Sequence, residues 1–158
     1  MSAPLAYYLT WTTYGTRVHG DERGTVDREH NRLDQRPLLP NRGHRERMHR
    51  ELAQSPFVMA DEERRVVAGA IRDHCEIRGW AIHALNVRTN HVHIVVDCRE
   101  THTPELAMAQ FKSWGTRRLL TAGLIEHGRR IWTDHGSTRW INDPGKLMLA
   151  KDYVLNCQ

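Results

Sequence analysis

The sequence predicts an α+β fold of the ferredoxin-like type: a split β-α-β-β-α-β antiparallel sheet with helices on one face and an additional C-terminal helix. Three observations predict it. Short segments rich in aromatic and β-branched residues alternate with amphipathic helical segments. Only three turn residues separate the two middle strands, and glycines or Asp-Pro and Thr-Pro pairs mark the other boundaries. A chain of 158 residues fits one domain, 1–158, with a well-buried core.

The first strand is predicted over Ala6–Thr13, where aromatic and β-branched residues are dense. A long polar insertion at about residues 15–56 follows it. The first helix is predicted over Asp61–Arg78, because an aspartate at the start, two glutamates in the first turn and a glycine after the end are typical helix boundaries. Its expected apolar stripe consists of Val67, Ala70, Ile71, His74 and Ile77.

Residues 80–87 and 91–96 both alternate between two faces, which predicts an antiparallel hairpin across Arg88-Thr89-Asn90. In the first of these strands, Trp80, Ile82 and Ala84 are expected to share a face.

Thr103 and Pro104 predict the start of a second long helix, which ends at Gly123. A last strand over Trp132–Ile141 is weakened by Gly136, and Asp143-Pro144 predicts the start of a C-terminal helix.

The composition favours a globular, nucleic-acid-binding protein. The formal net charge is +4, and 20 of the 23 basic residues are arginine, the side chain best suited to phosphates and bases. A GC-rich genome would produce the same bias. No run approaches the ~20 apolar residues that span a bilayer, and Met1-Ser2-Ala3-Pro4 does not resemble a secretory signal, so we expect a cytoplasmic protein. The three cysteines lack paired spacing and are expected to be reduced.

The most informative motif is His91-Val92-His93. Two histidines two apart on a strand project from one face, while Val92 and Ile94 project from the other. Two adjacent imidazoles form half of a metal site. The alternative is a pair of ordinary histidines on a half-buried strand, and a third ligand must come from elsewhere in the fold.

The segment Thr89-Asn90-His91-Val92-His93-Ile94-Val95-Val96 resembles the HUH motif (His, hydrophobic, His) of single-tyrosine HUH transposases, including REP-associated tyrosine transposases and their domesticated relatives. The opening strand Tyr8-Leu9-Thr10-Trp11-Thr12 and the helix-then-hairpin order support the resemblance. So does the end of the chain, Tyr153-Val154-Leu155-Asn156-Cys157-Gln158, which is similar to the helix that bears the nucleophilic tyrosine.

The resemblance implies cleavage of single-stranded DNA by the Tyr153 hydroxyl, giving a 5′-phosphotyrosine and a free 3′-OH. It implies that His91 and His93 hold a divalent ion, Mg or Mn. Family members carry a Gln or Asn one turn after the tyrosine as a further ligand. Here Gln158 is the expected ligand and Asn156 the alternative, a departure in spacing that leaves room for a catalytically impaired copy. The resemblance further implies that the protein binds single-stranded or hairpin DNA and forms a homodimer.

Further basic and aromatic side chains are candidates for DNA contacts, the aromatic ones as stacking platforms for unpaired bases. The basic candidates are Arg42, Arg45, Arg47, Arg88, Lys112, Arg117 and Arg118. The aromatic candidates are Trp11, Tyr14, Trp114 and Trp140, of which most are expected to belong to the core.

Three other interpretations compete with a nuclease. A histidine-triad nucleotide hydrolase needs a third histidine where the chain has Val95. An RNA-recognition domain shares the topology but carries stacking aromatic rings where this strand has histidines. A domesticated transposase that acts as a DNA-binding regulator stays open, and Tyr153 would then be an aromatic residue at the edge of the core.

Overall fold

The computed structural model describes residues 4–16 and 54–156. Arg42, Arg45, Arg47, Gln158 and most of the predicted polar insertion lie outside these ranges. The described elements are β1 (Ala6–Thr13), α2 (Asp61–Arg78), β2 (Ala81–Val87), β3 (His91–Asp97), α3 (Pro104–Thr121), β4 (Trp132–Ile141) and α4 (Pro144–Asn156).

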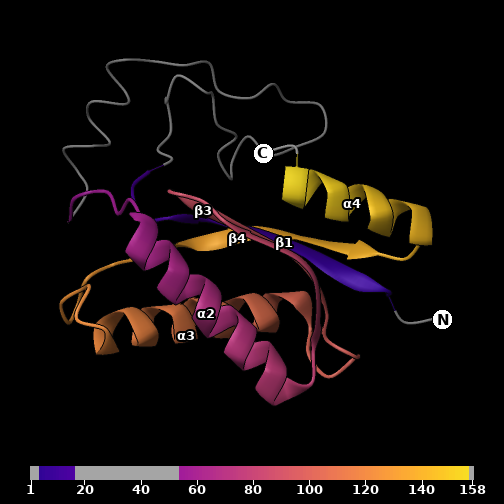
Figure 1. The fold of residues 1–158 in the computed structure, drawn as a ribbon, viewed down its shortest axis with the longest axis horizontal. Helices are drawn as coiled ribbons and strands as arrows, with labels where there is room; N and C mark the ends of the chain where they lie inside the picture. The colour runs from indigo at the N-terminus through magenta and orange to yellow at the C-terminus, as the bar shows by residue number, and fades with distance from the viewer. Residues whose placement is uncertain (1–3, 17–53, 157–158) are drawn as a thin grey trace, which may run out of the picture.

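The four strands form one antiparallel sheet in the order β2-β3-β1-β4. This is the order that a split β-α-β-β-α-β chain produces. Helices α2 and α3 cover one face, and α4 lies across the other (Figure 1). The predicted fold class, including the additional C-terminal helix, is confirmed.

The main core lies between the sheet and the α2–α3 layer. Trp11 and Leu9 of β1, Ile94 of β3 and Phe111 of α3 are fully buried there. The Trp11 and Phe111 rings stack with their centroids 6.1 Å apart. Each such side chain contributes about 1.5–3 kcal/mol when it leaves water, so this layer supplies most of the hydrophobic stabilisation.

Helix α2 corrects two details of the sequence analysis. Its N-cap is Ala60, without a side-chain hydrogen bond, and Asp61 is the first helical residue, where its charge still complements the helix dipole. Ile77 is 79% exposed, whereas Cys75 is buried. Ile77 lies six residues from Ile71, about 240° round the helix, so it cannot share the buried stripe.

Strand β2 departs from simple alternation. The register with β3 shifts between Ile82 and Ala84, the position of a β-bulge. Ile82 and Leu85 therefore contact the main core, while Ala84 packs under α4. A bulge inserts one residue and reverses the faces that follow it, so the predicted shared face of Trp80, Ile82 and Ala84 is wrong.

The starts of α3 and α4 agree with the sequence. The Thr103 hydroxyl accepts a hydrogen bond from the Leu106 N–H at 3.2 Å, and the Asp143 carboxylate accepts one from the Lys146 N–H at 3.0 Å. Both caps satisfy N–H groups that a helix start leaves without internal partners.

Gly136 belongs to β4 for a steric reason. A Cβ atom there would lie 2.6 Å from the Thr10 carbonyl oxygen and 2.7 Å from the Met108 sulfur. Only glycine permits this close approach between β1, α3 and β4.

Helix α4 packs through Val154 onto a small apolar cluster on the second face of the sheet, formed with Ala6, Ala84, Val95 and Ile141. Asn86 on β2 also donates a hydrogen bond to the Val154 carbonyl at 3.0 Å. These contacts fix the helix beside the polar part of that face. Within 4–16 and 54–156, no helix has the length and apolar character needed to cross a membrane.

Candidate active site

Strand β3 holds His91 and His93 on the face of the sheet that α4 partly covers. Val92 and Ile94 point to the opposite side and are fully buried in the main core. The two imidazole rings meet edge to face, with centroids 4.5 Å apart. His93 is 8% exposed and His91 is half-buried. The spacing of the motif therefore brings the two rings together, as the sequence predicts.

The His93 ring is held from β1. Its Nδ1 atom forms hydrogen bonds with the Tyr8 hydroxyl at 3.1 Å and the Thr10 hydroxyl at 3.2 Å. Thr10 is the direct partner of His93 in the β1–β3 register, and Tyr8 is two residues away on the same face. These contacts engage Nδ1, so a cation bound by His93 would be coordinated through Nε2.

The His91 ring is held within β3 and its turn. Its Nδ1 atom lies 2.7 Å from the side-chain oxygen of Asn90, which can only accept, so this nitrogen carries the proton. The Asn90 backbone carbonyl accepts a hydrogen bond from the Thr13 N–H at 2.9 Å, which ties the turn to β1. A histidine held in this way presents Nε2 to a metal, an arrangement found around metal-binding imidazoles.

Tyr153 reaches the same place from α4. Its ring centroid lies 6.4 Å from that of His93, and its side chain is 49% exposed. Both side chains line a cavity of about 410 Å³, together with Tyr8, Thr10, Ser137 and Arg139. The phenol, an imidazole and several hydroxyls thus share one solvent-accessible space within a single chain.

The donor set fits part of a divalent-metal site. Two adjacent imidazoles suit such an ion when oxygen ligands complete its coordination. Among the residues that the structure describes, no third His, Cys, Asp or Glu joins them in a metal-binding group. The Asn156 amide donates to the Asp152 carboxylate at 2.8 Å, one turn earlier on α4.

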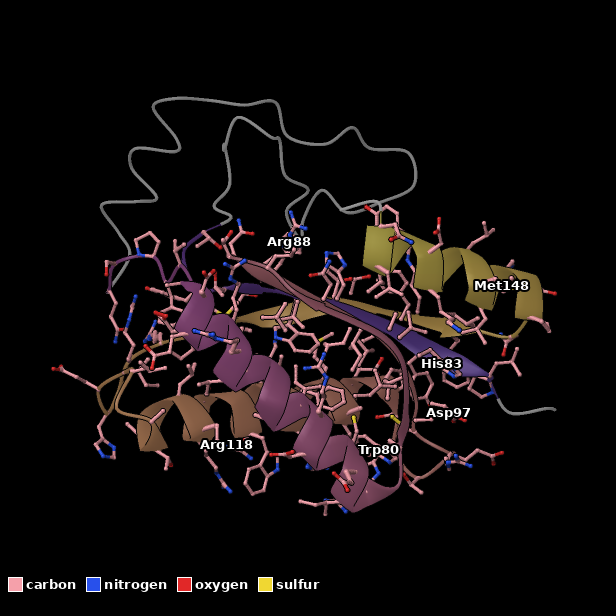
Figure 2. All side chains as sticks on the ribbon, in the orientation of Figure 1. Trp80, His83, Arg88, Asp97, Arg118 and Met148 are labelled. Atoms are coloured by element: carbon pink, nitrogen blue, oxygen red, sulfur yellow. The ribbon has the colours of Figure 1, made fainter. Side chains whose placement is uncertain are left out.

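Of the predicted basic contacts that the structure describes, Arg88 lies next to the histidine pair, because its backbone N–H donates to the His91 carbonyl at 2.8 Å. Arg88 lies in the β2–β3 turn, near the start of β3, whereas Arg118 lies on α3, on the other side of the sheet (Figure 2). Arg118 pairs with Asp73 at 3.0 Å. Arg117 sits over the Trp114 ring at 5.0 Å. Their role in DNA binding stays a prediction.

Lys112 and Trp11 have structural roles on the α2–α3 side. The Lys112 ammonium donates to the Thr133 carbonyl at 2.8 Å, joining α3 to β4, and burial lowers the pKa of this lysine. Trp11 is 1% exposed, so it cannot stack on a base. Tyr14 is half-buried, and Trp114 and Trp140 are 38% and 60% exposed.

Sequence reasoning missed four residues of the cavity: Tyr8, Thr10, Ser137 and Arg139. Each lies on the same face as His93, because Tyr8 pairs with Arg139 and Thr10 pairs with Ser137. The alternation of Ser137 and Arg139 is visible in the sequence. Their place opposite the histidines follows only from the strand order.

The cysteines described by the structure take no part in the site. Cys75 and Cys98 are buried in the main core. Burial raises the pKa of each thiol to about 12, so both stay protonated and unreactive at neutral pH.

An antiparallel ferredoxin-like sheet with a His-hydrophobic-His strand facing a tyrosine on a C-terminal helix has the layout of a single-tyrosine transposase domain. Comparison with known proteins agrees. Residues 54–154, well over half of the chain, match the family described as "Transposase IS200 like". The chain belongs to the IS200-like transposase family.

Two solved structures share the fold. One is a REP-associated tyrosine transposase bound to a REP hairpin, with a TM-score of 0.56 and 13% identity over 98% of this chain. The chain spans 66% of the length of that protein. The other is a Deinococcus radiodurans R1 protein described as a candidate transposase, with a TM-score of 0.53 and 16% identity, covering 94% of this chain and 88% of that one. No curated protein sequence matches the chain.

Proposed function

We propose that the protein nicks single-stranded DNA and transfers the strand through a 5′-phosphotyrosine, in a reaction that depends on a divalent ion. The observation that carries the proposal is the position of the Tyr153 ring, 6.4 Å from that of His93, which in turn contacts His91. The nucleophile and the His93 imidazole open onto one cavity, and the His91 imidazole lies next to that of His93. This arrangement suits phosphoryl transfer by a tyrosine.

In the proposed step, the Tyr153 oxygen attacks the phosphorus of a phosphodiester. A bond forms between that oxygen and phosphorus while the bond from phosphorus to the 3′ oxygen breaks. The phenolic proton leaves to solvent, and the departing 3′ oxygen takes up a proton to become a 3′-OH. Because one phosphate ester replaces another, a second 3′-OH can reverse the step and join new ends.

The residues in and around the cavity would have separate roles in this step. His91 and His93 would hold Mg²⁺ or Mn²⁺, with Gln158 as the expected further ligand and Asn156 as the alternative. When bound, such an ion polarises the phosphate and stabilises charge on the leaving oxygen. Tyr8 and Thr10 keep the His93 ring in place. The half-exposed Tyr153 can meet a strand that enters from solvent.

The proposed substrate is single-stranded or hairpin DNA. The structurally similar REP-associated tyrosine transposase, which was solved bound to a REP hairpin, supports this choice. We further propose that chain 1–158 forms one transposase-like domain with its polar insertion at about 15–56, that it acts as a homodimer, and that it resides in the cytoplasm.

A second function has its own support. Family members carry a Gln or Asn one turn after the tyrosine, whereas this chain has Cys157 four residues after Tyr153. This departure favours a domesticated transposase that binds DNA as a regulator without cutting it. The two functions differ in one product, the covalent protein–DNA adduct.

The test is adduct formation. The full chain is incubated with Mg²⁺ or Mn²⁺ and single-stranded hairpin DNA from the flanks of its own gene, and the products are separated under denaturing conditions. We expect a slower-migrating adduct that disappears in Tyr153→Phe and in His91→Ala. Tyr7→Phe is the matched control, because Tyr7 lies on the same strand as Tyr8 but faces the main core.

Each outcome decides between the functions. An adduct that depends on Tyr153 and on His91 supports the enzyme. DNA binding without any adduct supports the regulator. If the protein neither binds nor cuts this DNA, both proposals fail.

A further inference from the structure

The cavity beside Tyr153 contains one cationic side chain among its lining residues, Arg139 of β4. Among the described strands, β4 is at the edge of the sheet and pairs with β1 alone. Arg139 is the register partner of Tyr8, and Ser137 is the partner of Thr10. Both β4 side chains therefore lie on the face that carries His93, across β1 from it.

Arg139 differs from Arg64 and Arg118 in its electrostatic surroundings. Arg64 pairs with Asp61, and Arg118 pairs with Asp73. Within 4–16 and 54–156, Arg139 makes no ion pair with an acidic side chain, and the lining of its cavity includes no Asp or Glu. A guanidinium placed among hydroxyls, an imidazole and a phenol is suited to an anion.

We propose that Arg139 binds the non-bridging oxygens of the phosphodiester that Tyr153 attacks, with the Ser137 hydroxyl as an adjacent donor. This assignment rests on the proposed function, since it concerns the same cavity. The planar guanidinium donates two parallel hydrogen bonds to a phosphate. Such contacts orient the phosphorus toward the phenol and stabilise the charge that spreads over its oxygens in the transition state.

The site then has two sides. The histidine pair lies on β3, and the anion-binding guanidinium lies on β4, with β1 between them. Tyr153 reaches this face of the sheet from α4. A phosphate between the two sides would contact Arg139 directly and would lie next to the ion that the histidine pair would hold.

The competing explanation is that Arg139 only protects an exposed edge strand, because charged side chains are common at sheet edges. The two explanations differ in what Arg139 contacts. A phosphate ligand makes binding depend on one particular phosphate of the DNA. Edge protection makes it depend on none.

The test measures binding of single-stranded DNA by the full chain carrying Tyr153→Phe, which cannot cut. The probe is a short oligonucleotide from the flank of the gene, with each phosphate in turn replaced by a neutral methylphosphonate. We compare this protein with versions that add Arg139→Gln or Arg78→Gln. Arg78→Gln removes the same charge from the last turn of α2, on the opposite face of the sheet.

We expect Arg139→Gln to weaken binding and to reduce the slope of log K against log salt by about 0.7, the value for one phosphate of a single strand. One methylphosphonate position should weaken binding to the Tyr153→Phe protein and to the Arg78→Gln control, and have no effect once Arg139→Gln is present. If Arg139→Gln shows the same salt dependence and the same response to each methylphosphonate position as Arg78→Gln, the assignment is overturned in favour of edge protection.

A rate measurement separates this inference from the proposed function. With Tyr153 present, Arg139→Gln should slow adduct formation by about 100-fold. Arg139→Lys should recover only part of the rate, because an ammonium lacks the two-pronged geometry. An adduct that forms at the wild-type rate in Arg139→Gln contradicts the inference and leaves the proposed function intact. If the effect of one methylphosphonate position depends on Arg139 but no adduct forms, the phosphate contact is supported and the proposed nuclease activity is contradicted.

Discussion

The two faces of the sheet are built from different chemistry. The face under α2 and α3 is a continuous apolar layer that includes Trp11 and Phe111. The face under α4 has a small apolar cluster around Val154, next to the cavity with its imidazole, hydroxyls, guanidinium and phenol. The first face supplies the stability that allows the second to hold polar groups with little packing of its own.

Each face also buries a histidine. His74 of α2 is 5% exposed and His93 is 8% exposed. The His74 Nε2 atom bonds the Gln110 side chain at 2.7 Å, and Trp80 and Phe111 pack edge-on against its ring. Burial of a histidine therefore does not identify a site. What distinguishes His93 is a second imidazole, a phenol and a cavity beside it.

Replacing His74 and His93 with alanine, one at a time, is the strongest test of the difference between the two faces. His93→Ala should lower the rate of adduct formation by at least about 100-fold, because a metal ligand that stabilises transition-state charge is lost. His74→Ala should leave the rate per folded molecule unchanged but lower the free energy of unfolding by about 2 kcal/mol or more. Urea denaturation and gel-based adduct rates measure the two effects. Equal loss of adduct in both variants would refute the division between the faces.

A second prediction sharpens the role of β1. Tyr8→Phe combined with Thr10→Val removes both hydroxyls that bond the His93 Nδ1 atom. Loss of such outer contacts typically weakens metal binding about 10- to 100-fold. Titration with Mn²⁺, followed by calorimetry, measures it. The control is Tyr7→Phe with Thr138→Val, which makes the same chemical changes at positions that bond His102 and Glu105 instead. A control that loses as much affinity would show a general loss of structure.

Two glycines should respond to alanine with opposite signs. Gly136→Ala places a Cβ against the Thr10 carbonyl and the Met108 sulfur, and we expect a loss of about 1–3 kcal/mol in the free energy of unfolding. Gly69→Ala in α2 has open space around it, and alanine should stabilise the helix by about 0.5–1 kcal/mol. Chemical denaturation of both variants is the measurement. Destabilisation by Gly69→Ala would show that α2 is packed differently.

The buried histidine of the helix layer predicts an acid-sensitive core. Burial lowers the pKa of His74 below its usual value of 6.5. In the unfolded chain this histidine takes up a proton more readily than in the folded protein, so the free energy of unfolding falls as the pH drops below about 6.5. His74→Phe should reduce that fall. Denaturation curves at about pH 8 and about pH 5 measure the difference, and an unchanged pH dependence in His74→Phe would count against this role.

Periodicity predicts the elements and their faces wherever one pattern runs without interruption. His91 and His93 share a face because a strand alternates strictly. Thr103 and Asp143 cap the helices they precede, since capping depends on neighbours in the sequence. The resemblance to HUH transposases supplied Tyr153, which periodicity alone places at the edge of the core.

The remaining features depend on contacts between distant segments. The bulge between Ile82 and Ala84 is set by pairing with β3. Arg139 and Ser137 face the histidines only because β1 separates β3 from β4 in the sheet. Gly136 looks like a weak point in a strand until the Thr10 carbonyl and Met108 are seen against it. None of these contacts leaves a periodic trace in the sequence.

Two tyrosines line the cavity. Tyr8 bonds the His93 ring, whereas Tyr153 is the nucleophile of the proposed reaction. The most direct measurement traps the adduct, digests protein and DNA, and identifies by mass spectrometry which peptide carries the nucleotide. We predict the α4 peptide that contains Tyr153. A nucleotide on the β1 peptide, or the absence of any modified tyrosine in a protein that binds the DNA, would contradict the proposed site.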